Sequence, residues 1–259
     1  MVDGLAFPES LRWHDGALFA SDIFGGVVLG PDGVVVEVPA RPSGLGWLPD
    51  GRLLVVAMQD RSVLVVEGGT AEVWADLSGL AAGDGNDMLV DGAGRAYVGN
   101  FGYDYAAGAE RQPADLLLVQ PDRSVSVAAR EVWFPNGMAL TADGSTLLVA
   151  ETPAERITAF TVGDDGALHD RRVWADLGST RPDGISLDAE GGLWVASPGT
   201  GELLRVVEGG RVIDRLDPPQ GQAQGCLVVG DLLYACSTPT HDLAEALTLR
   251  AGRIDVLQL

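Results

Sequence analysis

The sequence predicts an all-β protein with the architecture of a six-bladed β-propeller, and three observations favour this fold class. One hairpin-like motif recurs six times, the turns are rich in Asp and Gly, and helical patterning is almost absent. Successive copies begin 34, 43, 50, 47 and 42 residues apart. These spacings lie near the ~40–50 residues of a propeller blade. A β-sandwich or a pair of β domains would not explain a repeat that stays in register from end to end.

Each copy has the chemistry of a β-hairpin, because runs of β-branched and aromatic residues flank a turn built on Asp-Gly or a similar pair. In chain order the copies are ESLRWHDGALFASD from Glu9, SGLGWLPDGRLLVVAM from Ser43, NDMLVDGAGRAYVGN from Asn86, NGMALTADGSTLLVAE from Asn136, DGISLDAEGGLWVAS from Asp183 and GCLVVGDLLYACS from Gly225. A weaker repeat, VWADLS at 73–78 and VWADLG at 173–178, is expected to form outer strands.

The ends of the chain are expected to close the ring. Segment 253–259 has the pattern of a strand that pairs with the last blade and with the N-terminal residues. No linker or low-complexity stretch interrupts the repeat, so residues 1–259 are expected to form a single domain. Only segment 241–249 has helical propensity, and a loop with one turn would fit it equally well.

Composition narrows the possible partners. The chain has 259 residues, a formal net charge of −20 and 17 basic residues, all of them arginine. The absence of lysine excludes Schiff-base catalysis, pyridoxal chemistry and a P-loop. The acidic balance predicts no nucleic-acid partner and no anionic membrane partner, because both require a basic face. Small molecules and cations are expected instead.

The sequence also predicts a cytoplasmic location. No run approaches the ~20 apolar residues of a membrane helix, and MVDGLAFPES lacks the basic and apolar regions of a secretion signal. Cys226 and Cys236 fall within one expected hairpin, where a disulfide is geometrically open. In the cytoplasm two reduced, buried thiols are favoured. The oligomeric state has no signal in the sequence.

Aligning the six copies predicts a ring of polar side chains. The first residue of each innermost strand falls at one equivalent position, which is occupied by Glu9, Ser43, Asn86, Asn136, Asp183 and Gly225. Innermost strands line the central channel of a propeller, so these residues should converge on the axis. Two carboxylates and two amides form an oxygen-rich set that suits Ca²⁺, Mg²⁺ or Mn²⁺ better than a zinc site of nitrogen and sulfur.

An alternative interpretation is that Asn-Gly and Asp-Gly pairs simply begin turns, as they do in many β proteins. This interpretation does not explain Glu9, which is a poor turn former in the same register. It also leaves two like charges converging on one axis, where they repel unless a cation offsets them. The pattern therefore predicts a metal site on the central axis.

Longer segments around these positions resemble a known family. They are PESLRWHDGALFASDI near the N-terminus, RPSGLGWLPDG at 41–51, GNDMLVDGAGRAYVGNFG at 85–102, FPNGMALTADGSTLLVAET at 134–152 and RPDGISLDAEGGLWVAS at 181–197. Together they are similar to the gluconolactonase, regucalcin (senescence-marker protein) and luciferin-regenerating-enzyme family. The resemblance implies a six-bladed propeller with one axial divalent cation, usually Ca²⁺, with Mg²⁺, Mn²⁺ and Zn²⁺ as alternatives. It implies Glu9, Asn136 and Asp183 as ligands, and Asn86 as a fourth ligand or as the group that orients substrate.

The activity that the resemblance implies is metal-dependent opening of a lactone ring, with Asp183 and Asn86 in catalytic roles. Asp183 would accept a proton from the attacking water. Activation of water by the cation itself stays open, because a metal-bound carboxylate is a weak base. A covalent route has little support, since Ser43 and Thr180 have no matching His and no G-x-S-x-G motif is present.

Substrate contacts are expected from the end of the ring where the innermost strands begin. The long loop at 101–114 and the loop at 238–252 should return to this end. The candidate substrate-binding residues are Asn86, Phe101, Tyr103, Trp133, Phe134, Arg181 and His241.

One position predicts a departure in substrate. Family members that act on sugar lactones carry an arginine two residues before the channel Asn, and this chain has Asp84 there. Phe7 is a further apolar residue at the expected mouth, so a less polar lactone or ester is expected in place of gluconolactone. Arg41 and Arg181 each precede a ring position by two residues and would supply a compensating cation.

Three other functions fit the same sequence. A phosphotriesterase would use a similar calcium propeller to cleave a different bond. A non-catalytic interaction propeller should have apolar or small residues at the ring positions, which the two carboxylates argue against. A calcium-buffering protein would bind the cation without turnover.

Overall fold

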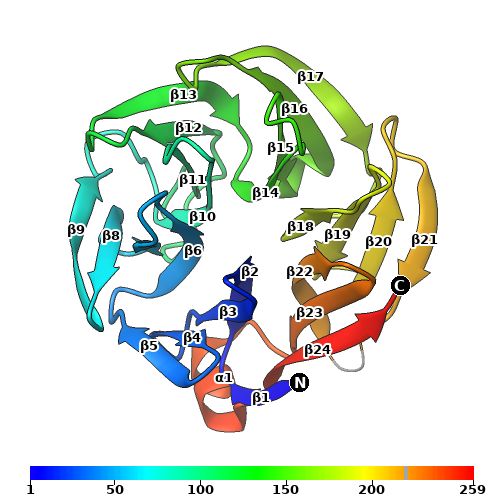
Figure 1. Ribbon diagram of the computed structural model, residues 1–259. Coiled ribbons are helices and arrows are strands. Elements are labelled where there is room, and N and C mark those ends of the chain that lie inside the picture. The colour runs from blue at the N-terminus through cyan, green and yellow to red at the C-terminus, as the bar shows by residue number, and fades with distance from the viewer. Residues whose placement is uncertain (219–220) are drawn as a thin grey trace.

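The computed structural model describes residues 1–218 and 221–259, and it confirms the predicted six-bladed β-propeller (Figure 1). Six four-stranded antiparallel sheets stand around a central axis, each with one edge strand innermost. Alternating runs such as those of β7 and β15 bury both faces, which places each sheet between two neighbours.

The blades follow one another in chain order. Blade 1 contains β2 (Pro8–His14), β3 (Ala17–Asp22), β4 (Val27–Gly30) and β5 (Gly33–Glu37), blade 2 contains β6 (Pro42–Trp47), β7 (Leu53–Ala57), β8 (Ser62–Glu67) and β9 (Thr70–Asp76), and blade 3 contains β10 (Gly85–Val90), β11 (Ala96–Asn100), β12 (Ala114–Val119) and β13 (Val125–Val132). Blade 4 contains β14 (Pro135–Leu140), β15 (Thr146–Glu151), β16 (Arg156–Val162) and β17 (Leu168–Asp176), and blade 5 contains β18 (Ile185–Leu187), β19 (Leu193–Ser197), β20 (Glu202–Val206) and β21 (Val212–Leu216).

The last blade joins the two ends of the chain, as predicted. It consists of β22 (Gln222–Val229), β23 (Leu232–Thr238), β24 (Gly252–Gln258) and, as its outermost strand, β1 (Val2–Leu5). Val2 pairs with Ile254 and Leu5 with Gly252. The ring is therefore closed by backbone hydrogen bonds between the first and last strands. The two VWADL segments lie in β9 and β17, which are outer strands as expected.

The hydrophobic core is divided among the interfaces between blades. One apolar cluster lies at each of the six interfaces, and in the cluster between blades 2 and 3 Leu54 packs with Val98 and Trp74. Cys226 and Cys236 are buried within this core and are free thiols, which confirms the expectation for both. Burial of apolar surface between consecutive blades is the main source of stability for a ring of this kind.

A buried ion-pair network supports blade 4. Glu151 is fully buried at the end of β15, and its carboxylate accepts hydrogen bonds from Arg156 at 2.9 and 3.0 Å and from the Thr158 hydroxyl. It also accepts from the backbone N–H of Trp133 at 2.7 Å and from Arg171 at 3.2 Å. The carboxylate thereby connects the β13–β14 link to β16 and β17.

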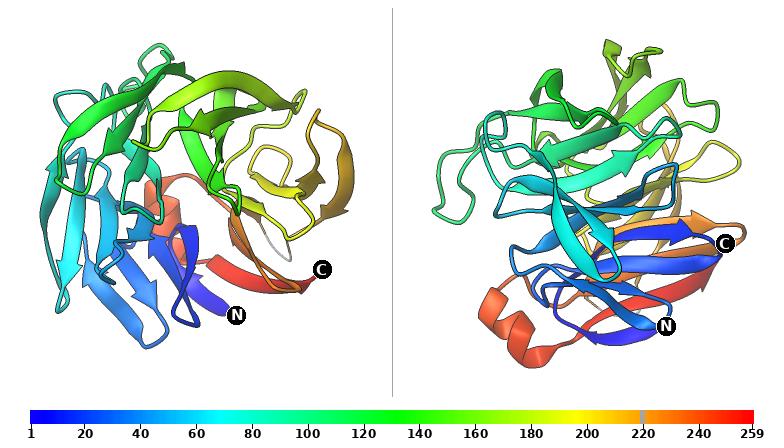
Figure 2. Two further views of the ribbon diagram at one scale, coloured as in Figure 1. Left: turned by 45° about the horizontal axis from the view of Figure 1, so that its top comes forward. Right: turned by 60° about the vertical axis from the view of Figure 1, so that its left-hand side comes forward.

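Helical structure is limited in the described part of the chain to α1 (Leu243–Leu249) and one 3₁₀ turn, η1 (Thr152–Ala154). The Asp242 carboxylate caps α1 by accepting from Glu245 N at 2.8 Å, so the helical alternative for this segment is correct. No helix in the described ranges is long and apolar enough to cross a bilayer. Helix α1 stands over one end of the ring (Figure 2).

Candidate metal and substrate site

The innermost strands change register where each reaches the axis. In blades 1 to 4 and 6 the pairing with the second strand is interrupted at the ring position, between Glu9 and Arg12 in β2 and between Pro135 and Met138 in β14, for example. In blade 5 the strand begins only at Ile185, two residues after Asp183. Such interruptions redirect a side chain away from the normal alternation of a strand. Here they turn the ring residues toward the central cavity.

The sixth ring position is Gln224, and the sequence alignment was wrong by one residue in assigning it to Gly225. The register shift of β22 lies between Ala223 and Gly225, which leaves Gln224 in the irregular position. Gly184 N donates to Gln224 O at 2.9 Å, just as Gly137 N donates to Asp183 O at 3.2 Å in the preceding blade. Gln224 is fully buried. The last hairpin turns at Gly230-Asp231, which reverses the order of the acidic residue and glycine found at the turns of most other copies, so its register was not predictable from the sequence.

Glycines after the ring residues allow the innermost strands to approach closely. A Cβ atom on Gly137 would lie 2.5 Å from the carbonyl oxygen of Asp183, and one on Gly184 would lie 2.6 Å from the Cα of Gly225. Neither glycine has a positive φ angle. The Asn-Gly and Asp-Gly pairs are therefore close-packing positions at the axis, and the alternative that they begin turns is wrong for both.

The two ring asparagines are oriented by hydrogen bonds from their amide nitrogens. The Asn86 amide donates from Nδ2 to Pro135 O at 3.1 Å. The Asn136 amide donates from Nδ2 to Thr152 Oγ1 at 3.2 Å, and this hydroxyl donates to Pro182 O at 2.8 Å. Because each amide nitrogen is used for positioning, the amide oxygen is the group that each asparagine can offer to a cation.

The two ring carboxylates are buried and perturbed. Glu9 and Asp183 are 9% and 6% exposed. Burial raises the pKa of Glu9 well above its usual value, and the charges of Asp183 and Asp87 raise it further. Burial likewise raises the pKa of Asp183, with a further rise from Asp87 and a smaller opposing effect from Asn136. The causes are desolvation and like-charge repulsion, which a bound cation would relieve.

Unpartnered oxygens at the ring fit a cation. Asp183 Oδ1 and Gln224 Oε1 are both buried without a hydrogen-bond partner among the described residues. Within residues 1–218 and 221–259, no three His, Cys, Asp or Glu side chains form a metal-binding group. A cation would therefore rely on amide as well as carboxylate oxygens, as hard divalent ions do.

A cavity of about 540 Å³ opens above the ring. Its lining includes four predicted ring residues, Glu9, Asn86, Asn136 and Asp183, and the added Gln224. It also includes the predicted contacts Phe101, Tyr103, Phe134, Arg181 and His241, together with Phe7, Arg41 and Asp84. Ser43 and Trp133 do not line it: Ser43 is fully buried, and Trp133 lies beside the Glu151 network.

Aromatic side chains form one wall of this cavity. Phe101 stacks on Phe134 with ring centroids 4.3 Å apart, and Tyr103 and Tyr105 lie 6.3 Å from Phe134. The loop between β11 and β12 supplies three of these four rings, as expected. On the other side, His241 meets Phe7 edge-on at 5.3 Å and lies 3.2 Å from the amide nitrogen of Gln224.

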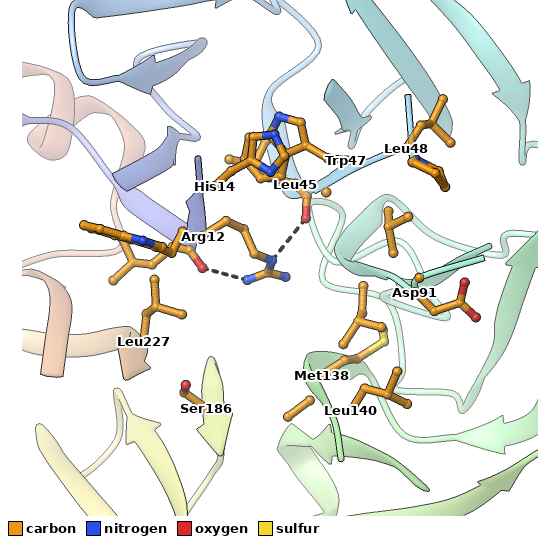
Figure 3. Close-up of a pocket in the computed structure, with 18 of the residues that line it drawn as sticks. Arg12, His14, Leu45, Trp47, Leu48, Asp91, Met138, Leu140, Ser186 and Leu227 are labelled. Atoms are coloured by element: carbon orange, nitrogen blue, oxygen red, sulfur yellow. Dashed lines mark hydrogen bonds between the residues drawn. The ribbon is translucent and has the colours of Figure 1, made fainter. Parts of the chain in front are cut away.

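The opposite end of the axis holds a separate cavity of about 800 Å³, which shares no lining residue with the first (Figure 3). Arg12 extends from β2 into this region and donates from Nε to Leu45 O at 3.1 Å. Its Nη2 pairs with Asp87 at 2.8 Å and donates to Met88 O at 2.6 Å. Asp87 is thus committed to Arg12 beside the ring, and its charge acts on the ring carboxylates from behind.

Comparison with known proteins identifies a family and several relatives. The SMP-30/gluconolactonase/LRE-like family matches residues 7–236. A 6-deoxy-6-sulfogluconolactonase from Pseudomonas putida is 28% identical over 211 residues, covering 78% of this chain and 71% of the relative. Regucalcin from Gallus gallus is 33% identical over 141 residues, covering 53% of this chain and 44% of the relative.

Among solved structures, a gluconolactonase from Xanthomonas campestris shares 26% identity and a TM-score of 0.75, covering 92% of this chain and 85% of that protein. The chain spans less than two thirds of some curated relatives, 44% of regucalcin and 62% of a relative from Sulfolobus acidocaldarius. The match over residues 7–236 extends across five complete blades and into the sixth. The chain therefore belongs to the SMP-30/gluconolactonase/LRE-like family.

Proposed function

We propose that this protein is a divalent-cation-dependent hydrolase that opens the ring of a lactone. Asp183 and Gln224 each have a buried oxygen without a hydrogen-bond partner among the described residues, and both line a cavity of about 540 Å³ together with Glu9. This observation carries the proposal. Relatives named as lactonases support the reaction class. The proposal includes a cytoplasmic location and one domain over residues 1–259.

Glu9, Asn136 and Asp183 would hold the cation, with the amide oxygens of Asn86 and Gln224 as further donors. We favour Ca²⁺, because all these donors are oxygens and Ca²⁺ accepts six to eight of them, while Mg²⁺, Mn²⁺ and Zn²⁺ stay alternatives. When bound, the cation supplies positive charge that polarises the lactone carbonyl and offsets the repulsion between the carboxylates.

The chain's own groups complete the proposed chemistry. Asp183 would hold the cation through one carboxylate oxygen, and its other oxygen can accept the proton of the attacking water. Asn86 uses one N–H for Pro135 O, and its second N–H can donate to the substrate. The aromatic wall of Phe101 and Phe134 excludes water from one side of the cavity, which strengthens these polar contacts.

The mouth favours substrates with few hydroxyl groups. Asp84 occupies the position where sugar-lactone enzymes have an arginine, and burial raises its pKa. Phe7, Ile23 and Met58 form an apolar cluster beside it. Polyhydroxylated lactones would leave their hydroxyls unpaired against these apolar side chains, which would weaken binding of the transition state.

A substrate panel tests the proposal. Metal-stripped protein would receive Ca²⁺, Mg²⁺, Mn²⁺ or Zn²⁺ and be assayed with lactones, open-chain esters and a phosphotriester. We expect cation-dependent lactone hydrolysis, with gluconolactone poorer than an alkyl lactone of the same ring size. A clear preference for gluconolactone would contradict the substrate inference. Phosphotriester cleavage alone, or cation binding without turnover of any substrate, would overturn the proposed reaction.

A further inference from the structure

A second ring of side chains surrounds the mouth of the cavity. Each of its members stands two residues before an inner-ring position, and all six line the cavity. We define this mouth ring as Phe7, Arg41, Asp84, Phe134, Arg181 and Gln222. Consecutive blades are neighbours around the axis, so members three blades apart lie on opposite sides. Arg41 of blade 2 is therefore opposite Arg181 of blade 5, and Phe7 is opposite Phe134.

The charges of this cavity differ from those of the rest of the chain. Three arginines, Arg41, Arg111 and Arg181, line it together with three carboxylates, so its formal charge is zero in a protein of net charge −20. A bound divalent cation would make it +2. The cavity at the opposite end is acidic, because Arg12 is there the only cation beside Asp15, Asp50 and Asp91 among the described lining residues (Figure 3). The mouth above the inner ring is thus less negative than the cavity at the opposite end.

Arg41 differs from Arg111 and Arg181, the other arginines of this cavity, in being half-buried where they are exposed. Its guanidinium is half-buried and makes no hydrogen bond or ion pair with any residue in the described ranges. It lies 5.4 Å from the centroid of Phe24, whose ring limits its position. Arg181, by contrast, is 52% exposed and 3.8 Å from Glu155.

The backbone at Arg41 is also unusual. Its φ angle is +64°, in the left-handed region that residues other than glycine seldom adopt. Backbone hydrogen bonds hold this conformation, from Arg41 N to Val38 O at 3.0 Å and from Met58 N to Arg41 O at 3.0 Å.

We propose that the substrate carries an oxyanion group, a carboxylate, sulfonate or phosphate, which Arg41 binds at the mouth while the carbon frame of the lactone contacts Phe7 and Phe134. This inference rests on the proposed lactone hydrolysis and names its substrate class. Asp84 lies on the neighbouring blade, and the charge of Arg41 lowers its pKa. A bound oxyanion would therefore compete with the Asp84 carboxylate for the guanidinium of Arg41.

The test uses two δ-lactones that differ only at the end of a short alkyl arm, one with a carboxylate and one with a primary amide. For the Ca²⁺-loaded wild type we expect kcat/KM to favour the carboxylate about 10- to 100-fold, as a charged hydrogen-bonded pair provides. Arg41→Met should bring the ratio close to one through a higher KM for the carboxylate. Arg41→Lys should recover part of the preference.

Arg211→Met is the matched control, because Arg211 is exposed and lies outside both cavities. The substitution removes the same unit of charge as Arg41→Met. This variant should keep the wild-type ratio. Equal kcat/KM for the two lactones in the wild type, or an unchanged ratio in Arg41→Met with an unchanged melting temperature, would overturn the inference and leave lactone hydrolysis standing.

Calorimetric binding of a carboxylated cyclic ether, which cannot be hydrolysed, separates the two proposals. If the wild type hydrolyses no lactone but binds this ether, and Arg41→Met weakens the binding at least tenfold, the oxyanion site stands and the hydrolase proposal fails. If the wild type and Arg41→Met bind the ether equally, the oxyanion site fails. Arg41→Gln repeats the measurement should Arg41→Met not fold.

Discussion

Glu9 and Asp183 occupy equivalent ring positions but differ in their proposed roles. Asp183 is assigned as ligand and proton acceptor together, whereas Glu9 is assigned only as a ligand. We expect Glu9→Gln to weaken Ca²⁺ binding and to recover much of its activity at high Ca²⁺. Asp183→Asn should stay about 10²- to 10⁴-fold slower even when saturated, because it lacks the general base.

Turnover of the best lactone against Ca²⁺ concentration, with calorimetric Ca²⁺ affinity measured in parallel, distinguishes the two variants. Recovery of wild-type turnover by Asp183→Asn at saturating Ca²⁺ would show that Asp183 is a ligand alone. The attacking water would then owe its activation to the cation.

Single residues also mark where sequence reasoning about the site succeeded and where it stopped. Glu9, Asn86, Asn136 and Asp183 could be predicted because each begins a copy with the same turn chemistry, and the structure brings all four to one cavity. Gln224 could not, because a one-residue irregularity in β22 has no local signature in the sequence. Trp133 was placed at the mouth by proximity to Phe134, but its backbone N–H is bound to Glu151.

At the scale of elements, the Glu151 network holds three strands and a connection of blade 4 together. Burial alone would raise the pKa of Glu151, but hydrogen bonds from Arg156, Thr158 and Trp133 N outweigh it and lower the pKa. A carboxylate with a lowered folded-state pKa stabilises the protein fully above its unfolded-state value. That stabilisation is lost as the pH falls through the folded-state pKa.

We therefore expect Glu151→Gln to lower the free energy of unfolding by about 3 kcal/mol at neutral pH. The difference from the wild type should shrink as the pH falls below about 4, where the wild-type carboxyl also becomes neutral. Urea unfolding at several pH values measures both quantities. Glu208→Gln, which removes an exposed partner of Arg172, should change stability by less than about 1 kcal/mol. A pH-independent loss in Glu151→Gln would contradict the ionic origin of the effect.

In the loops, too, some features were predictable from the sequence and others were not. The length of the 101–114 loop predicted a cover for the channel, and the structure places Phe101, Tyr103 and Tyr105 in the cavity wall. The stacking of Phe101 on Phe134 from the next blade was not predictable, because it depends on how two blades approach. For segment 241–249, where the sequence fitted a helix and a loop equally well, the structure shows α1 capped by the carboxylate of Asp242.

For the whole molecule, the ring of blades is expected to be more stable with its cation than without it. The carboxylates of Glu9 and Asp183 come from blades 1 and 5, so their repulsion opposes closure of the ring. Chelation should lower the melting temperature. Added Ca²⁺ should raise the melting temperature progressively by mass action. At a Ca²⁺ concentration a hundredfold above Kd, the free energy of unfolding should rise by about 2.7 kcal/mol. Calorimetry with and without chelator measures this shift.

Glu9→Gln provides the comparison for this prediction, because it should show a smaller Ca²⁺-dependent shift at the same concentration. Identical melting curves of the wild type with and without chelator would exclude a cation at the ring. The fold itself was predictable at this scale because the repeat extends along the whole chain. The pairing of β1 with β24 followed from the need to close the ring.

The arginine that separates the two axial cavities has a consequence for the order of events during catalysis. Arg12 bridges three blades behind the inner ring, and the cavities on its two sides share no wall. A cation at the ring would then enter and leave through the same cavity mouth as the lactone. Under the proposed function, binding would be sequential, with the ion first and the lactone second, and the hydroxy acid would depart before the ion. A saturating product should therefore slow the off-rate of Ca²⁺ to a chelator, so the enzyme would retain its cation best while it is working.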